Sequence, residues 1–428
     1  MKRVLIRNGR VIDPANGTDS MADVAIEGGV IQQIAAGIED PGGSEIFDAS
    51  GMIVAPGFID IHVHLREPGF EHAETIESGS RAAAAGGFTS ICPMPNTQPV
   101  NDNPTVTNYI RAQARRNAVV NVFPIGAITK NCAGEELAAI ASMKQAGAVA
   151  ISDDGRPVMN ARLVRRAMEF ASSLDIPLIE HCEDLHLSAG GDMHEGLQST
   201  RLGLRGIPRS SEDVMVARDL ILAEVTGCRY HVAHISSKYS VEMVRFAKSR
   251  GLPVTAEVTP HHFVLSEVDM LPYDSNYKMK PPLRETTDVD AVMAGLVDGT
   301  IDAIATDHAP HAGAEKMQEF ERCPFGIIGL ETSLGLALER LFHSGLVGLP
   351  QLVATFTSKP AAALSLPRGT LSVQAPADLT IFDLDHDWTY DVTRSASKSR
   401  NSPFHKRTFR GGPLATMVNG EFVWKYNA

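Results

Sequence analysis

The chain has 428 residues, of which 43% are apolar and 21% charged, as in an ordinary globular protein. Its net charge of -12 argues against a nucleic-acid partner, and no run approaches the about 18 apolar residues of a membrane span. The five scattered cysteines include no Cys-x-x-Cys pair, and no secretory signal follows Met1, which together predict a cytoplasmic protein with reduced thiols.

Both ends of the chain carry short strand-like stretches. Asn-Gly or Gly-Gly pairs break three of these stretches, which is typical of β-hairpins. The stretches are Val4–Asp13, Asp23–Ile34, Ala377–Leu384 and Ala415–Trp424. We therefore expect residues 1–55 and 366–428 to pair into one small β-sandwich domain built from both termini.

Between these ends, apolar and β-branched runs alternate with helical stretches. Buried parallel strands read as continuous apolar runs, and their alternation with helices is typical of βα units. The runs are Phe58–His64, Phe88–Pro93, Val119–Ile125, Ala148–Ser152, Ile176–His181, Tyr230–Ile235, Pro253–Val258 and Ile301–Thr306. The expected helices include Ala161–Ser173, Ser210–Val225, Ser240–Ser249 and Thr287–Val297. The pattern predicts an α/β protein in which residues 56–365 form a (β/α)8 TIM-like barrel, with its site at the C-terminal ends of the strands.

Two histidines end the first of these runs. His62 and His64 stand two residues apart in Gly57–Arg66, so on a strand their side chains point to the same face. Two imidazoles on one face can bind a metal ion, although two histidines on a polar strand face would give the same pattern. The pair alone is weak evidence for a metal site.

Other side chains of metal-binding type follow the ends of other runs. They are Asp153, Asp154, His181, His234 and Asp307, with His308 and His311 just beyond. An Asp after a strand often caps a helix, and Asp-Gly is a common turn, so each has an ordinary alternative. Four histidines and two carboxylates nevertheless exceed the three protein ligands of a usual catalytic zinc. The surplus predicts two metals that share a bridging carboxylate.

Several motifs run in order through nearly the whole chain. They are Gly57-Phe-Ile-Asp-Ile-His-Val-His-Leu-Arg-Glu-Pro-Gly, Met94-Pro-Asn-Thr, Ser152-Asp-Asp-Gly, Glu180-His-Cys-Glu, His234-Ile-Ser, Thr259-Pro-His-His and Ala305-Thr-Asp-His-Ala-Pro-His. With these motifs the chain resembles the dihydroorotases of the amidohydrolase superfamily, and most closely the bacterial class I type.

The resemblance implies a set of metal ligands, namely His62, His64, Asp154, His181, His234 and Asp307. The first two histidines and Asp307 would bind one metal, the other two histidines would bind a second, and Asp154 would bridge the two. Asp154 is preferred to Asp153 because the family's bridging Asp stands directly before the Gly. Dihydropyrimidinases and hydantoinases bridge with a carbamylated lysine instead, and Ala148–Arg156 contains no lysine.

The resemblance also implies a clamp on the substrate carboxylate, made by Arg66, Asn96 and His311. A guanidinium suits this task because it binds a carboxylate through two hydrogen bonds and stays charged. The alternative for Arg66 is a solvated charge at the barrel rim. Further substrate contacts would come from His64, Lys280, Phe325 and Gly326. Lys280 stands where many family members have an Asn, and because lysine donates hydrogen bonds but accepts none, the contact to the ring is expected to differ here.

A dihydroorotase reversibly closes N-carbamoyl-L-aspartate to L-dihydroorotate, with loss of water, in pyrimidine biosynthesis. In the hydrolytic direction the resemblance implies that hydroxide held by one or two zinc ions attacks the ring carbonyl. Asp307 would act as the general base and then as the general acid. His261 and His262 are adjacent, so on a strand they would face opposite ways, and we interpret both as structural.

The sequence leaves other functions and partners open. An allantoinase or hydantoinase would use the same barrel and metals, but hydantoins lack the carboxylate that the clamp would hold. A non-catalytic scaffold for aspartate transcarbamoylase would have lost metal ligands. A homodimer, or an active enzyme bound to aspartate transcarbamoylase, is compatible with the sequence. The connection His308–Phe325 is long, and it is either a mobile lid or an ordered surface loop.

Overall fold

The strands in the middle of the chain form a closed parallel barrel. The structure is a computed structural model that describes residues 2–40, 42–270 and 272–426. Its barrel strands are β6 (Phe58–Val63), β7 (Phe88–Pro93), β8 (Asn121–Val122), β9 (Ile151–Ser152), β10 (Leu178–Glu180), β13 (Tyr230–Val232), β14 (Val254–Val258) and β15 (Ala303–Ile304). They lie in a three-stranded sheet, β6-β7-β8, and a five-stranded sheet, β15-β14-β13-β10-β9. Parallel bridges from Gly126 to Ile151 and from Val63 to His308 join both edges and close the barrel. The fold prediction is confirmed.

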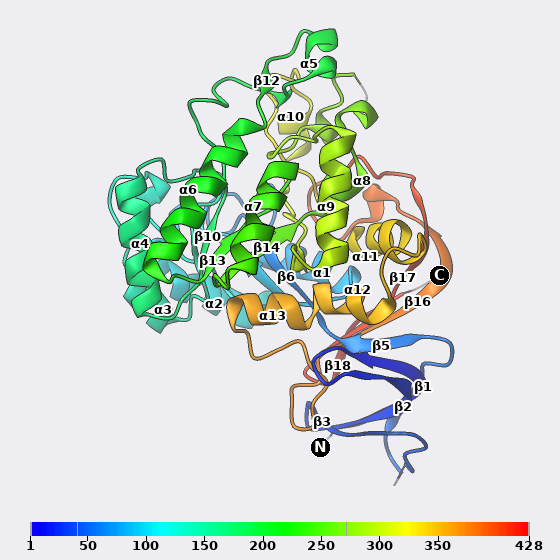
Figure 1. Cartoon of the computed structure of the whole chain (residues 1–428). Helices are drawn as coiled ribbons and strands as arrows, with labels where there is room; N and C mark the ends of the chain where they lie inside the picture. Colours follow the sequence, from blue (N-terminus) through cyan, green and yellow to red (C-terminus); the bar gives the residue numbers. More distant parts are fainter. Residues whose placement is uncertain (1, 41, 271, 427–428) are drawn as a thin grey trace.

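Most helices of the chain cover the outside of the barrel, whereas α5 (Leu197–Leu202) and α10 (Gly313–Lys316) lie at one end of it (Figure 1). The other helices are α1 (Ile76–Ala85), α2 (Pro104–Asn117), α3 (Ile140–Ala146), α4 (Ala161–Ser173), α6 (Ser210–Thr226), α7 (Lys238–Ser249), α8 (Pro260–Val264), α9 (Thr286–Asp298), α11 (Ser333–Ala337), α12 (Leu349–Phe356) and α13 (Ser358–Leu364). Side chains that cap the N-terminus determine where several helices begin. The side chains of Asn160 and Ser237 accept hydrogen bonds from backbone N–H groups in the first turns of α4 and α7. Among the described residues, no helix has the length and apolar character to span a membrane.

The two ends of the chain share one sheet. It runs β18-β17-β16-β5-β1-β2-β3, and β4 pairs with β1. The strands are β1 (Arg3–Asp13), β2 (Thr18–Glu27), β3 (Val30–Ala35), β4 (Glu45–Asp48), β5 (Ile53–Pro56), β16 (Leu379–Thr389), β17 (Thr408–Val418) and β18 (Glu421–Lys425). Side chains from both ends, including Val11, Val24, Ile381 and Met417, form one buried core. The pairing of β5 with β16 joins the termini, as expected for a composite domain.

The mouth of the barrel lies away from most of this sheet. β6 starts directly after β5, and Figure 1 shows the region of α5 and α10 at the opposite end of the barrel from β1, β2 and β3. A short parallel pair, β11 (Met193–His194) with β12 (Gly206–Ile207), lies in the β10–α6 connection. The C-terminal ends of the strands therefore open beneath long connections.

The segment between β16 and β17 returns to the barrel mouth. Asn401 Nδ2 donates to the carbonyl of Ala309 at 2.9 Å and to that of Gly326 at 3.0 Å. Its Oδ1 accepts from the backbone N–H of His311 at 3.1 Å. The C-terminal part of the chain thus supports the loop after β15, and the domain boundary near residue 366 stays a prediction.

Candidate metal centre

The strand carrying His62 is tied to the strand that precedes Asp307. The buried carboxylate of Asp60 on β6 accepts from the backbone N–H of Thr306 at 3.1 Å and from its hydroxyl at 2.5 Å. It also accepts from the backbone N–H of His62 at 3.0 Å. Because Thr306 follows β15 directly before Asp307, one buried carboxylate sets how the two chain segments lie relative to each other.

The structure brings all six predicted ligands to one place at the C-terminal ends of the strands. Asp154 lies at the centre. Its Oδ1 is 3.3 Å from His62 Nε2, 3.7 Å from His181 Nδ1 and 3.6 Å from His234 Nε2, and its Oδ2 is 3.4 Å from His64 Nε2. Asp307 Oδ1 is 3.0 Å from His64 Nε2 and 3.5 Å from His62 Nε2. The six side chains therefore form one cluster, with the Asp154 carboxylate in its middle.

Several atoms of this cluster are buried without a hydrogen-bond partner. Among the described residues they include His62 Nε2 and Asp154 Oδ1, although these atoms are only 3.3 Å apart. An unpaired buried polar atom is costly unless another group satisfies it. His62, His64 and Asp307, and likewise His62, Asp154 and His234, place ligand atoms close enough to share one ion. Nitrogen and carboxylate donors in this arrangement fit divalent metals.

The two adjacent aspartates have different surroundings. The Oδ1 of Asp153 accepts from the backbone N–H groups of Ile128 at 2.8 Å and Thr129 at 3.0 Å, and its Oδ2 accepts from the Thr129 hydroxyl. Asp153 is therefore satisfied within the protein, whereas Asp154 faces histidines. This geometry supports the choice of Asp154 over Asp153 for the bridging position.

Neighbouring side chains determine which ring nitrogens face the centre. His62 Nδ1 lies 2.5 Å from Glu257 Oε1, and His64 Nδ1 lies 2.9 Å from Asn96 Oδ1. Both rings therefore donate from Nδ1 and leave Nε2 as the ligand atom. Glu257 was not among the residues predicted from the sequence. The signal available for it was a lone carboxylate inside the apolar run of β14, because a buried charge needs a partner.

The charges of the cluster stabilise one another. Burial alone would raise the pKa of Asp154, but the surrounding histidines, His62 foremost, hold that pKa well below its usual range. Burial opposes protonation of His181, yet the Asp154 and Glu183 carboxylates raise the pKa of this histidine to about 9. Burial likewise opposes protonation of His62, but nearby carboxylates, Asp154 foremost, raise the pKa of His62, so without metal His62 and His181 hold protons. A divalent cation would replace them, so we expect metal binding to release protons.

Next to the centre is a cavity of about 350 Å³, lined by His64, Arg66, Asn96, Lys280 and Phe325 among others. Arg66 Nε donates to the carbonyl of Pro310 at 3.0 Å and Nη2 lies 3.4 Å from His311 Nε2, which leaves Nη1 for a ligand. His311 Nε2 donates to the carbonyl of Phe325 at 2.8 Å. Burial, and then the Arg66 cation, lower the pKa of His311 to about 3, so this ring is neutral at pH 7. The seven predicted substrate residues all line the cavity: His64, Arg66, Asn96, Lys280, His311, Phe325 and Gly326.

The backbone φ is positive at three non-glycine residues of the site. The φ angles are +60° at Arg66, +29° at His234 and +45° at Asp307. Residues with a side chain rarely adopt such angles, and those that do are concentrated at functional sites. The turns at the strand ends thus aim these side chains into the mouth at some cost in backbone energy.

The prediction that His261 and His262 lie on a strand is wrong. Both lie in the short helix α8, not on a strand. His262 is nevertheless tied into the fold, with Nε2 2.8 Å from the carbonyl of Pro281 and Nδ1 2.7 Å from the Thr259 hydroxyl. Thr259-Pro260 starts a helix because proline is favoured in a first turn, and the apolar-run pattern could not show this.

Internal bonds hold the connection after β15. Lys316 Nζ donates to the carbonyls of Pro324 at 2.9 Å and Gly326 at 3.2 Å. The buried Lys278 Nζ donates to the carbonyl of Phe320 at 2.6 Å. These bonds stabilise the closed arrangement of the loop, and its movement as a lid stays a prediction.

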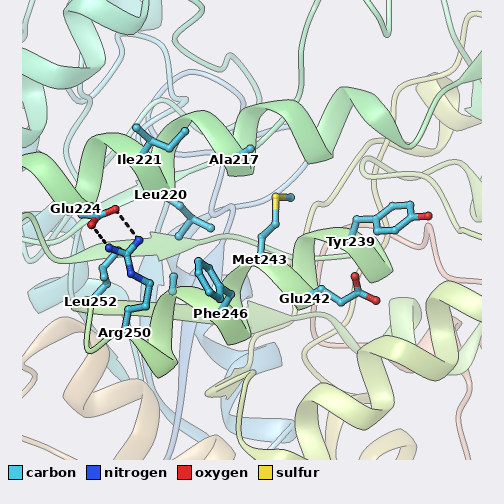
Figure 2. Close-up of a pocket in the computed structure, with 11 residues that line it drawn as sticks. Ala217, Leu220, Ile221, Glu224, Tyr239, Glu242, Met243, Phe246, Arg250 and Leu252 are labelled. Carbon is cyan, nitrogen blue, oxygen red and sulfur yellow. Dashed lines mark hydrogen bonds and ion pairs between the residues drawn. The ribbon is translucent and has the colours of Figure 1, made fainter.

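An apolar groove lies elsewhere, between α6 and α7 on the flank of the barrel (Figure 2). Its lining includes the exposed side chains of Ile221 and Phe246. Its charged groups include Glu224 and Arg250, which pair with each other at 3.0 Å. The six predicted metal ligands and the polar side chains of the cavity lie at the barrel mouth instead, so we place the candidate site there.

The comparisons of sequence agree on a family, and the comparison of structures finds a similar fold. The model of the dihydro-orotase-like family matches residues 51–240. A protein of Solibacter usitatus named dihydroorotase is 69% identical over 421 residues, with 98% of each chain covered. One of the same name from Pelotomaculum thermopropionicum is 54% identical, again over 98% of each chain. Among solved structures, the L-hydantoinase (dihydropyrimidinase) of Arthrobacter aurescens superposes with a TM-score of 0.89 at 27% identity, over 100% of this chain and 97% of that one.

Proposed function

From the premise that this chain belongs to the dihydroorotase family, we propose that it interconverts N-carbamoyl-L-aspartate and L-dihydroorotate at the centre around Asp154. The main support is that this centre lies next to a cavity whose wall includes the guanidinium of Arg66. The product is a cyclic amide with one carboxylate. A metal centre acts on the amide, and a guanidinium binds the carboxylate.

A hydantoinase reaction is the second candidate, because a hydantoinase shares the fold at a TM-score of 0.89. That structure is only 27% identical, however, whereas the named dihydroorotases reach 69%. The centre itself also bears on the choice. Asp154 occupies the proposed bridging position between the two metals, and the sequence around it contains no lysine that could be carbamylated. These observations favour dihydroorotate over a hydantoin.

We assign the metal as zinc, one or two ions per chain. Six buried nitrogen and carboxylate donors suit zinc, and the unpaired atoms of His62 and Asp154 support a bound cation between them. When bound, the metals supply a water molecule acidic enough to ionise near neutral pH and polarise the carbonyl to be attacked.

The chain's own side chains would orient the substrate and move the proton. Arg66 and Asn96 would hold the substrate carboxylate, and His311 would join them once its Nε2–H turns from the Phe325 carbonyl to the carboxylate. The backbone at Phe325 and Gly326 would meet the ring amide. Asp307 Oδ1 lies 3.0 Å from His64 Nε2, at the edge of the cavity. Asp307 would take a proton from the attacking water and deliver it to the ring nitrogen that leaves. In the direction of ring closure the same carboxyl runs the transfer in reverse.

The first test is metal content by elemental analysis, together with dihydroorotate hydrolysis, on one purified sample. We expect one to two zinc per chain and turnover that a chelator abolishes and added zinc restores. Metal without turnover would indicate another cyclic amide or a required partner. A sample with neither would favour the scaffold for aspartate transcarbamoylase.

Replacing Arg66 with Lys should weaken substrate binding more than chemistry. The lysine keeps the charge but loses the two-pronged geometry, and a hydrogen bond to a charged group contributes about 1.5–3 kcal/mol. We therefore expect the KM for dihydroorotate to rise at least about tenfold, with zinc content unchanged. An unchanged KM in steady-state assays would contradict the clamp. Arg81→Lys, on the exposed side of α1 in an ion pair with Glu77, is the matched control.

We propose a small-molecule substrate and no nucleic-acid or membrane partner. A homodimer, and association with aspartate transcarbamoylase, remain proposals that mass measurement of the purified chain, alone and mixed with the transcarbamoylase, would test.

A further inference from the structure

One carboxylate lies between the metal centre and the substrate cavity. Glu183 follows β10, two residues after His181, and its side chain is only 8% exposed. Its Oε2 lies 3.1 Å from His181 Nε2, and its Oε1 lies 2.7 Å from Lys280 Nζ. Glu183 therefore contacts both His181, a predicted metal ligand, and Lys280, a cation in the wall of the cavity.

The bond to His181 determines how that ring faces the centre. His181 Nδ1 lies 2.8 Å from His234 Nε2 and 3.7 Å from Asp154 Oδ1, so Nδ1 is the ligand atom and Nε2 carries the proton. An acceptor carboxylate at Nε2 fixes this tautomer and makes Nδ1 a stronger ligand. Losing such a partner typically costs about 10- to 100-fold in metal affinity.

The bond to Lys280 holds a flexible side chain in one position. The Lys280 ammonium also lies 4.9 Å from the ring centroid of Phe325, and its side chain is 28% exposed toward the cavity. A carboxylate on one side and an aromatic face on the other restrict its rotamers. Because an ammonium only donates, it must face an acceptor oxygen of the ligand.

We propose that Glu183 is a positioning residue that serves both sites: it orients His181 for the metal and holds Lys280 as a specificity-determining contact to an oxygen of the substrate ring. The identity of the substrate rests on the proposed function, but the metal part does not. An amide at this position would have one acceptor oxygen for two donors. Glu183→Gln therefore keeps the shape of the side chain but can accept a hydrogen bond from only one of the two, His181 or Lys280, through its oxygen.

The metal part is tested by titrating metal-free protein with Co²⁺ and following its visible spectrum. We expect Glu183→Gln to bind the second equivalent of Co²⁺ about 10- to 100-fold more weakly than the unaltered chain. Lys280→Met should bind it within about threefold, because the carboxylate at His181 remains. Equal affinity in Glu183→Gln and the unaltered chain would overturn the proposal.

The substrate part is tested by KM for dihydroorotate in a double-mutant cycle. Lys280→Met should raise KM about tenfold or more in the unaltered chain, but much less in Glu183→Gln, where the lysine has already lost its anchor. Lys280→Arg should restore part of the loss. Equal effects of Lys280→Met in both backgrounds would mean that Glu183 does not position the lysine, and would overturn this part.

An exposed pair of the same composition serves as the control. Lys130 Nζ lies 2.6 Å from Glu136 Oε1, and both side chains are at least half exposed. Glu136→Gln and Lys130→Met should change neither Co²⁺ affinity nor KM. If the unaltered chain failed to turn over dihydroorotate, the proposed function would fall, but the Co²⁺ titration would still decide the role of Glu183.

Discussion

Asp307→Asn should fold normally and lose nearly all turnover. An amide is nearly the same size as a carboxyl but can neither accept the proton of the attacking water nor deliver it to the ring nitrogen. General acid–base catalysis typically contributes about 10²- to 10⁴-fold, so we expect kcat to fall at least about 100-fold. Steady-state hydrolysis of dihydroorotate measures the turnover, and thermal unfolding of the same sample measures the stability of the fold.

The metal content of this variant matters for its interpretation. Asp307 Oδ1 lies within 3.5 Å of His62 Nε2 and 3.0 Å of His64 Nε2, so the amide also weakens one metal position. Assays at saturating zinc separate lost metal from lost proton transfer. Asp302→Asn is the matched control, because Asp302 lies before β15 and its carboxylate pairs with Lys248 at 2.5 Å, away from the cavity. Activity of Asp307→Asn above a few per cent would contradict its role as the acid and base.

Asp154→Asn should lose metal, whereas Asp153→Asn should lose stability. Asp154 lies within 3.7 Å of four histidine nitrogens and is the only predicted ligand shared by both metal positions. We therefore expect its amide variant to hold at most one metal ion per chain and to lose turnover. Elemental analysis after desalting measures the content.

The neighbouring residue is the control for this variant. Asp153 accepts three hydrogen bonds from the segment at Ile128 and Thr129, and its amide variant would leave at least one donor poorly matched. A loss of this kind costs about 1–3 kcal/mol of unfolding free energy. We expect Asp153→Asn to unfold at lower denaturant concentration with metal still bound. Full metal content in Asp154→Asn would refute the bridging assignment.

Much of the fold followed from local pattern. Each barrel strand lies within one of the eight apolar runs, because a strand buried on both faces must be apolar throughout. Most of the strands, such as β8, are shorter than their runs, because a run reports burial whereas a strand requires backbone pairing. α4 has the predicted bounds Ala161–Ser173, but α7 starts at Lys238 instead of Ser240 because the Ser237 side chain caps it.

The position of the predicted ligands could also be derived from the sequence. The C-terminal ends of parallel barrel strands meet at one mouth, so residues such as His62, His181 and Asp307 must converge there wherever they stand in the chain. Their roles came from the resemblance to dihydroorotases and stay predictions. The choice between Asp153 and Asp154 gained its physical reason only from the hydrogen bonds that satisfy Asp153.

By itself, then, the sequence determined the barrel, the pairing of its two ends and the strand ends at which the predicted ligands stand, because these depend on periodicity and burial along the chain. Tertiary structure alone decided which side chains complete the site. Glu257 reaches His62 from β14, Glu183 joins His181 to Lys280, and Asn401 supports the loop after β15 from the far end of the chain. Such contacts join segments distant in sequence, and no local pattern encodes the distance between them.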